Sequence, residues 1–333
     1  MNRKWSIFLL QPFWWAIFLP AYAQDFHLSQ PLRMPVFLNP AAAGFQKRTY
    51  EFSGVYRSQW HQLTDPFRTL GTYLSTSLPA GKNKNQIIGL ALSGFADKAG
   101  AVNFTTSVFA LTGSFHYNFG DAFQHYIGGG FSVGSANVSL DIARITTDEF
   151  FLQGTQSEVL GFEKTSYADL SAGLVYNLLS DTTHLQMGLA CLHFNKPRVA
   201  FSSHAKSEVY PKMVFTVTYA YPLLKGIDFT PSVAAFFQGP AQELLVGFRL
   251  DYELPTLLAG DYGLAAALYL RYGDALIPAI ALVMDDLHVG LSYDLNIGTL
   301  ADAPSRLGAL ELTLTYRGTV RGISSGRVYN PRF

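Results

Sequence analysis

Near its C-terminal end the chain alternates apolar and polar residues one by one over two segments. In residues 287–295 the odd positions carry Leu, Val, Leu, Tyr and Leu, while the even positions carry His, Gly, Ser and Asp. Residues 310–317 repeat the pattern, with three leucines and a tyrosine on one face and glutamate, threonines and arginine on the other. A period of two predicts β-strands that have one apolar face and one polar face.

The same alternation recurs along most of the chain, with almost no helical periodicity between the segments. About fourteen candidate strands are bounded by turn residues. They cover residues 49–60, 67–78, 85–97, 105–117, 124–140, 167–178, 185–194, 212–221, 227–238, 241–252, 262–272, 274–283, 287–296 and 309–317. Single-chain bacterial barrels have an even number of strands. We therefore predict an all-β protein, a transmembrane antiparallel β-barrel over residues 49–317.

The lengths of the gaps between candidate strands predict an orientation. The longest gaps, at residues 141–166, 195–211 and 297–308, follow the fifth, seventh and thirteenth candidate strands. Barrels of the outer membrane have long extracellular loops and short periplasmic turns. Because all three long gaps follow odd-numbered strands, we expect both termini in the periplasm.

The two ends of the chain differ from the barrel region. Residues 1–23 have the form of a secretory signal peptide, with two early basic residues, an apolar stretch and an Ala-Tyr-Ala cleavage site at 21–23. Residues 24–48 contain three prolines and sustain neither period, so we expect an N-terminal segment at the periplasmic rim or in the lumen. Residues 318–333 are interpreted as a periplasmic tail.

Composition supports a lipid environment. Charged residues make up only 14% of the chain and aromatic residues another 14%, whereas soluble proteins average roughly 25% charged. The formal net charge of zero makes nucleic acid an unlikely partner, and outer-membrane lipid is the expected one. Aromatic residues near strand ends are interpreted as girdles at the lipid headgroups: Trp60, Tyr73, Tyr117, Tyr176, Tyr221, Tyr252, Tyr262 and Tyr272.

The sequence offers little for catalysis or for a cofactor. The histidines lack the spacing of a metal site, no serine has a Gly-x-Ser-x-Gly context, and Cys191 is the single cysteine. The glycines at 128–130 lack the Lys-Ser/Thr of a phosphate loop, so close packing is the better interpretation. We expect no enzyme activity, no metal and no cofactor. Charged residues on the inward faces are expected to pair across the lumen: Glu51, Arg57, Asp169, Arg249, Asp251, Arg271, Asp294, Glu311 and Arg317.

Several motifs resemble one family. They are Gln-Asp-Phe-His-Leu-Ser-Gln at 24–30, Phe-Leu-Asn-Pro-Ala-Ala-Ala-Gly at 37–44, Tyr-Arg-Ser-Gln-Trp at 56–60, His-Phe-Asn-Lys-Pro at 193–197, and the segments 271–278 and 289–296. Together they are similar to the PorP/SprF family of type IX secretion system outer-membrane proteins. The resemblance implies a component of the type IX secretion or gliding machinery that associates with periplasmic ring components. It also implies that such a barrel receives or anchors secreted surface proteins and recognises their C-terminal sorting domains.

Six residues of these motifs form the candidate partner-binding or lumen-closing motif: Asn39, Pro40, Gly44, Arg57, Gln59 and Trp60. Proline at 40 restricts the backbone of Asn39, and Gly44 permits a sharp bend. An alternative function is a FadL-like passive transporter of hydrophobic solutes, because a barrel of about fourteen strands with an N-terminal lumen segment also fits that class. The sequence leaves open which cargo is served, and whether in secretion or in gliding.

Overall fold

The computed structural model describes residues 25–60, 65–81, 85–100, 103–120, 124–141, 164–199, 207–254, 262–298 and 308–320. The predicted signal peptide lies outside the described residues, as does all of the predicted tail beyond residue 320. Within the described ranges, strands dominate and helices are short. No helix among the described residues is both long and apolar enough to cross a membrane.

Fourteen antiparallel strands form a closed barrel in which every strand pairs with its neighbours in sequence and β1 also pairs with β14. The strands are β1 (Tyr50–Gln59), β2 (Phe67–Ala80), β3 (Gln86–Ala99), β4 (Phe104–Asn118), β5 (Gln124–Ser139), β6 (Lys164–Leu179), β7 (His184–Leu192), β8 (Lys212–Leu224), β9 (Ile227–Gln238), β10 (Ala241–Glu253), β11 (Tyr262–Arg271), β12 (Ala275–Met284), β13 (Leu287–Asn296) and β14 (Ala309–Gly318). The predicted fold class is confirmed. The predicted boundaries differ most at Lys164 and Leu224, where the strands extend further.

The two faces of the wall follow the sequence alternation. On β14 the side chain of Leu312 points outward and is 45% exposed, whereas its neighbour Thr313 points into the lumen and is 1% exposed. Large apolar residues are exposed in the same way along the outside of the other strands. A barrel with an apolar exterior and a polar interior matches the surface that lipid requires.

The barrel has two distinct ends. Odd-numbered strands finish at one end, where the connections after β5, β7 and β13 are long; we call it the long-loop end. The other is the short-turn end, where β1 begins and where β8 and β12 connect to the next strand through two-residue turns. The three long connections therefore all follow odd-numbered strands, as the gap lengths predicted. The placement of both termini in the periplasm stays a prediction.

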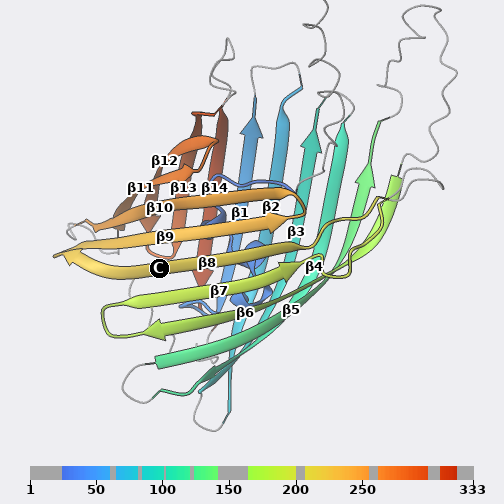
Figure 1. Ribbon diagram of the computed structural model, residues 1–333. Helices are drawn as coiled ribbons and strands as arrows, with labels where there is room; N and C mark the ends of the chain where they lie inside the picture. The colour runs from blue at the N-terminus through green and yellow to red at the C-terminus, as the bar shows by residue number, and fades with distance from the viewer. Residues whose placement is uncertain are drawn as a thin grey trace, which may run out of the picture.

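The N-terminal segment, residues 25–48, runs through the lumen (Figure 1). It contains the short helices η1 (Pro31–Arg33), α1 (Pro35–Leu38) and η2 (Pro40–Ala42), each with proline at its first position, where the missing N–H is not needed. Helix η2 packs against β4, β5 and β6. The segment begins beside residues of the long-loop end and reaches β1 at the short-turn end.

Apolar residues of the segment supply much of the packing inside the barrel. Leu28, Met34, Val36 and Ala43 form one buried cluster with wall residues of β1, β2 and β3, and Leu38 joins a second cluster on β7 to β12. Fully burying a Met or Leu side chain contributes about 1.5–3 kcal/mol. The lumen is thus a packed core along this stretch.

One girdle prediction is wrong. Tyr73 lies on the lumen face of β2, is 1% exposed, and donates its hydroxyl hydrogen to Glu51. It lies in the middle of β2, on the same face as the buried Thr69 and Ser75, so it is neither at a strand end nor in contact with lipid. Tyr117, Tyr252 and Tyr272 are exposed, in keeping with the prediction.

Candidate functional site

The lumen near the long-loop end holds a buried ion-pair network centred on Arg57. Its Nη2 lies 2.9 Å from Asp294 Oδ2 on β13, and its Nη1 donates to Gln59 Oε1 at 2.6 Å. The side chains of Arg57 and Asp294 are only 6% and 3% exposed. The guanidinium also donates, through Nε, to Ser29 Oγ of the N-terminal segment at 3.3 Å.

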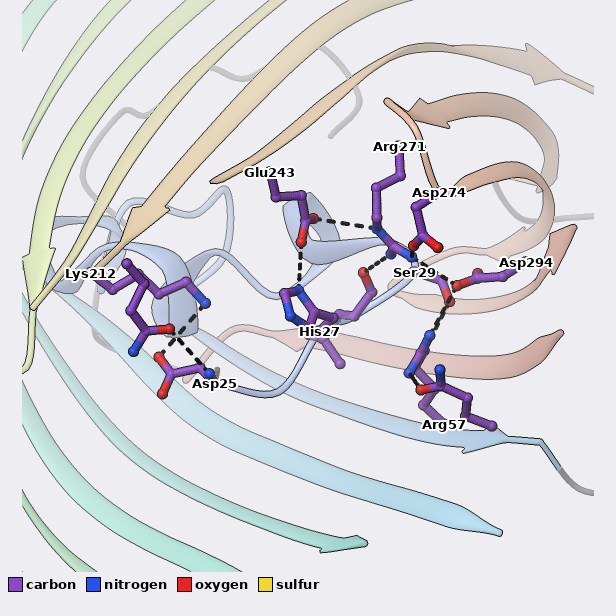
Figure 2. Close-up of polar contacts among 12 residues, drawn as sticks. Asp25, His27, Ser29, Arg57, Lys212, Glu243, Arg271, Asp274 and Asp294 are labelled. Atoms are coloured by element: carbon purple, nitrogen blue, oxygen red, sulfur yellow. Dashed lines mark hydrogen bonds and ion pairs between the residues drawn. The ribbon is translucent and has the colours of Figure 1, made fainter. Parts of the chain in front are cut away.

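Arg271, at the end of β11, extends this network to β10. It contacts Asp294 Oδ2 and Asp274 Oδ2, each at 3.1 Å through Nη1, and Glu243 Oε1 at 3.3 Å. Its Nη2 donates to the carbonyl oxygen of Leu28 at 2.8 Å. Figure 2 shows Arg57 and Arg271 converging on Asp294 from different strands. Buried charges persist where each has partners of opposite charge, and this network meets that condition.

Glu311 on β14 holds the backbone of the N-terminal segment. Its carboxylate is fully buried and accepts the N–H groups of Ser29 at 2.6 Å and Gln30 at 2.8 Å. Hydrogen bonds to a charged acceptor are stronger than those between neutral groups. The last strand of the barrel therefore fixes the first part of the described chain.

The start of the segment is fixed by a second charged group. Asp25 lies 2.9 Å from His193 Nε2 and 3.7 Å from Lys212 Nζ, while His193 Nδ1 contacts Asp169 at 2.6 Å. Burial alone disfavours both charged forms, yet the opposing charges outweigh it. They raise the pKa of His193 to about 10 and lower the pKa of Asp25 well below its ordinary value.

His27 contributes a third charged contact between segment and wall. Its Nδ1 pairs with Glu243, which in turn contacts Arg271 (Figure 2). Asp25, His27 and Ser29 are alternate residues, and each makes a polar contact with the wall. The first residues of the segment, 25–29, are thus held by polar contacts to several strands.

The first half of the sequence motif lies against small residues of the wall. Asn39 Nδ2 donates to the carbonyl oxygen of Leu174 at 2.9 Å, and its Oδ1 accepts the N–H of Ala41. A Cβ at Gly173 would lie 2.0 Å from Asn39 Oδ1. Only glycine permits this approach, which explains its presence inside a strand.

The bend that follows η2 is equally close to the wall. Gly44 has a positive φ of 71°, and a Cβ there would lie 2.2 Å from the Cα of Gly89 on β3. Pro40 lies against Gly130 of β5 in the same manner. The interpretation of the 128–130 glycines as a site of close packing is therefore supported at Gly130.

The second half of the motif lines a cavity at the long-loop end. This long-loop cavity has a volume of about 310 Å³, and Arg57, Gln59 and Trp60 line it together with Arg271 and Tyr272. Trp60 follows β1 with a positive φ of 56°; its N–H donates to the carbonyl of Gly308, and its ring lies 4.7 Å from that of Phe67. The N-terminal segment contributes His27 to the cavity lining.

The six motif residues thus occupy two places. Arg57, Gln59 and Trp60 line the long-loop cavity, whereas Asn39, Pro40 and Gly44 hold the segment against the wall. Sequence reasoning did not single out Asp25, His27 or Ser29 as site residues. Their i, i+2 spacing in residues 24–30 was the available signal, since alternate residues of an extended segment face one side.

Of the inward charges predicted to pair, all but Glu311 form ion pairs, and Glu311 accepts backbone N–H groups instead. Besides the network at Arg57, Glu51 pairs with Arg317 at 2.6 Å and Arg249 with Asp251 at 2.7 Å. Among the described residues, no group of three or more His, Cys, Asp or Glu side chains is arranged to hold a metal ion. The arrangement can bind polar groups, and its buried charges serve to hold the segment.

The chain is similar to several solved structures at low sequence identity. Among solved structures, the toluene transporter TbuX of Ralstonia pickettii matches with 10% identity and a TM-score of 0.47, over 86% of this chain and 94% of that chain. A FadL homologue of Pseudomonas aeruginosa matches with 10% identity and a TM-score of 0.44, over 85% and 94%. CdiB from Escherichia coli matches with 11% identity and a TM-score of 0.46, over 80% of this chain and 63% of that chain. A search of curated proteins finds no match.

A family model gives the more specific result. The model of the type IX secretion system membrane protein PorP/SprF matches residues 21–316. That range includes all of the motifs in which the resemblance was seen, together with nearly the whole barrel. The chain therefore belongs to the PorP/SprF family, and it is an outer-membrane component of type IX secretion.

Proposed function

We propose that this barrel receives or anchors secreted surface proteins at its long-loop end and associates with periplasmic ring components at its short-turn end. The C-terminal sorting domains of the secreted proteins are the groups recognised. The long-loop end is the extracellular one in this proposal, because long loops face outward in outer-membrane barrels. The single observation that carries the proposal is the occupied lumen of a type IX family member.

An occupied lumen suits a binding role. The segment is held by the Arg57 network, by Glu311 and by the Asp25 contacts, and its apolar residues are packed against the wall. A folded cargo protein has no passage along this lumen. What the barrel offers at the long-loop end is the cavity beside Trp60 and Tyr272, with long connections nearby.

The same lining does not favour the alternative of a hydrophobic-solute transporter. Three basic residues, Arg57, Lys212 and Arg271, and three acidic ones, Glu243, Asp274 and Asp294, border the long-loop cavity. An apolar solute gains little from such a surface, since charged groups retain bound water. Solute leakage through liposomes that contain the purified barrel tests this alternative directly.

The main experiment replaces aromatic residues of the cavity. Tyr272, which is 77% exposed, and Trp60 are changed singly to Ala in the native host. Tyr252→Ala is the matched control, because Tyr252 is exposed near the short-turn end of β10. Cargo display on the cell surface and heat-modifiable barrel in the outer membrane are measured together.

Loss of cargo display with normal barrel levels in the two cavity variants, and normal display in the control, supports the proposal. Normal display in all three variants contradicts a role for the cavity. Partner recovery is measured in the same strains, and ring components are expected to co-purify with both cavity variants, since their contacts are at the opposite end.

A further inference from the structure

A second cavity lies at the short-turn half of the lumen, beneath the N-terminal segment. This short-turn cavity has a volume of about 180 Å³ and is lined by residues near the ends of β1, β10 and β14, among them Glu51, Asp251 and Arg317. Arg33 of helix η1 enters it from the segment. It is separate from the long-loop cavity, with which it shares no lining residue.

Guanidinium groups outnumber carboxylates in the lining of this cavity. Three guanidinium groups line it, those of Arg33, Arg249 and Arg317, against the two carboxylates of Glu51 and Asp251. Each carboxylate is already paired, Glu51 with Arg317 at 2.6 Å and Asp251 with Arg249 at 2.7 Å. The buried carboxylate of Asp228 also acts on Arg249, so Arg33 is the one guanidinium of the three that has no ion pair among the described residues.

Arg33 has no partner of its own in the part of the chain that the structure describes. Its backbone N–H bonds to Gln30, while no hydrogen bond or ion pair joins its guanidinium to a described residue. Burial, with Arg249 and Arg317 nearby, lowers the pKa of Arg33 to about 10. A guanidinium desolvated beside like charges is unfavourable by itself and favourable when an anion joins it.

One neighbouring group fits an anion, and another does not. Thr230 lines the cavity, and its buried Oγ1 has no hydrogen-bond partner among the described residues. His288 Nε2 lies 3.3 Å from Arg317 Nη1. Because a guanidinium only donates hydrogen bonds, this contact makes Nε2 the acceptor and leaves the His288 ring neutral. The basic character of the cavity therefore comes from the arginines, with the Thr230 hydroxyl beside them as a donor that has no partner among the described residues.

We propose that the short-turn cavity is a binding site for one oxyanion group, a carboxylate or a phosphate, held by the Arg33 guanidinium with Thr230 Oγ1 as a further donor. The planar guanidinium donates two parallel hydrogen bonds to such a group. The cavity lies inside the closed wall, so the anion arrives from water at the short-turn mouth. Arg249 and Arg317 keep 16% and 17% side-chain exposure, which shows that water reaches this region.

The test uses the full-length barrel purified in a neutral detergent. Thermal unfolding is followed with inorganic phosphate, with acetate, with a blocked tetra-aspartate peptide, and with chloride at matched ionic strength. An anion that binds only the folded barrel raises its unfolding temperature. Phosphate and acetate represent a free small anion, and the peptide represents a carboxylate carried on a chain.

Arg33→Gln is the test variant, and Arg198→Gln is the matched control, because Arg198 is an exposed arginine beyond β7 that pairs with Glu208. We expect wild type and control to be stabilised by at least one oxyanion beyond the chloride baseline. We expect Arg33→Gln to bind it roughly tenfold or more weakly, the loss typical of a charged hydrogen bond. Arg33→Lys keeps the charge without the paired donors and should be intermediate.

A second readout needs no ligand. Without any oxyanion, Arg33→Gln should unfold at a temperature equal to or above that of wild type, because it removes an uncompensated charge. A clear destabilisation, equal oxyanion binding by wild type and Arg33→Gln, or no effect beyond chloride in wild type would each overturn the proposal. These outcomes are independent of cargo display and ring association, so they do not depend on the proposed function.

Discussion

Arg57 lies where the first strand, the end of β13 and the N-terminal segment meet. Its guanidinium contacts Asp294, Gln59 and Ser29 at once. Arg57→Ala leaves Asp294 buried with Arg271 as its remaining cation, and loss of one partner from a buried pair costs roughly 3–5 kcal/mol. We expect the free energy of unfolding to fall by an amount at or below that range, because Arg271 compensates in part.

The measurement is urea unfolding of the purified barrel, with Arg57→Ala, Asp294→Asn and the double variant. Because the two residues touch, the double variant should lose less than the sum of the single losses. Strict additivity would show that the contact between them contributes nothing.

His193 gives a prediction for pH. Its pKa is about 10 in the folded barrel, against about 6.5 in an unfolded chain. Its contribution to stability is therefore complete below pH about 6.5 and is lost as the pH rises through about 10. Relative to His193→Asn, the wild type should lose unfolding free energy over this window. Parallel pH curves for the two proteins would contradict the assignment.

A fall in pH removes the stability that Asp25, the partner of His193, contributes, whereas a rise in pH removes the contribution of His193. The pKa of Asp25 is lowered in the folded barrel, so its contribution is present above about pH 3.9, the ordinary value of an Asp. That contribution is lost as the pH falls through the lowered folded value. The contact at the start of the segment is consequently strongest between these two limits, over mildly acidic and neutral pH.

At the scale of elements, the strand faces followed directly from the sequence. Leu312 and Thr313 were placed on opposite faces by period two alone, and the structure places them there. Alternation can be seen from neighbouring residues alone. Lipid outside and a polar lumen inside require it along every strand. Tyr73 was misplaced because the girdle prediction did not use this alternation, which puts Tyr73 on the lumen face of β2 with Thr69. There its hydroxyl donates to Glu51.

Leu312→Arg tests the outer face. An arginine that faces lipid near the middle of the membrane costs roughly 2–4 kcal/mol. Leu312→Met is the control, since it keeps an apolar side chain of similar volume. Reversible unfolding in lipid vesicles measures both, and equal stabilities would place Leu312 outside the apolar band.

The N-terminal segment shows what the sequence could not supply. Its prolines and its failure to alternate indicated that it is not a strand, but its contacts with Glu243, Glu311 and His193 join residues far apart in the chain. Such pairings depend on the closed barrel, in which strands distant in sequence face one another across the lumen. The motif residues Asn39 and Arg57 were identified together and proved to act at separate places.

The fit of Asn39 beside Gly173 can be measured with a double-mutant cycle. Gly173→Ala places a Cβ 2.0 Å from Asn39 Oδ1, and overpacking of this kind costs about 1–3 kcal/mol. Asn39→Ala removes the opposing atom and its cap, at about 0.5–2 kcal/mol. We expect the double variant to be more stable than the sum of the single losses predicts.

Gly113→Ala is the control for the cycle, because a Cβ at Gly113 meets nothing within 4 Å. It should leave the free energy of unfolding nearly unchanged. If Gly173→Ala behaves like this control, the segment does not lie against β6 as closely as the structure indicates.

For the molecule as a whole, the segment separates the long-loop cavity from the short-turn cavity. Deletion of residues 25–48, with the signal peptide joined to Thr49, should open a continuous water path. Single-channel recordings in planar bilayers should then show steady conductance for the deletion variant and little for the wild type. Comparable conductance in both would mean that the segment does not close the lumen.

The hydrogen bonds that Glu311 accepts from Ser29 and Gln30 have a consequence for the order of events during assembly. Glu311 belongs to the strand that is made last, and its partners precede the strand that is made first. Once β14 pairs with β1, the wall is continuous and the segment can no longer enter from the side. A segment that enters from the side must therefore be in place before the seam between β14 and β1 closes.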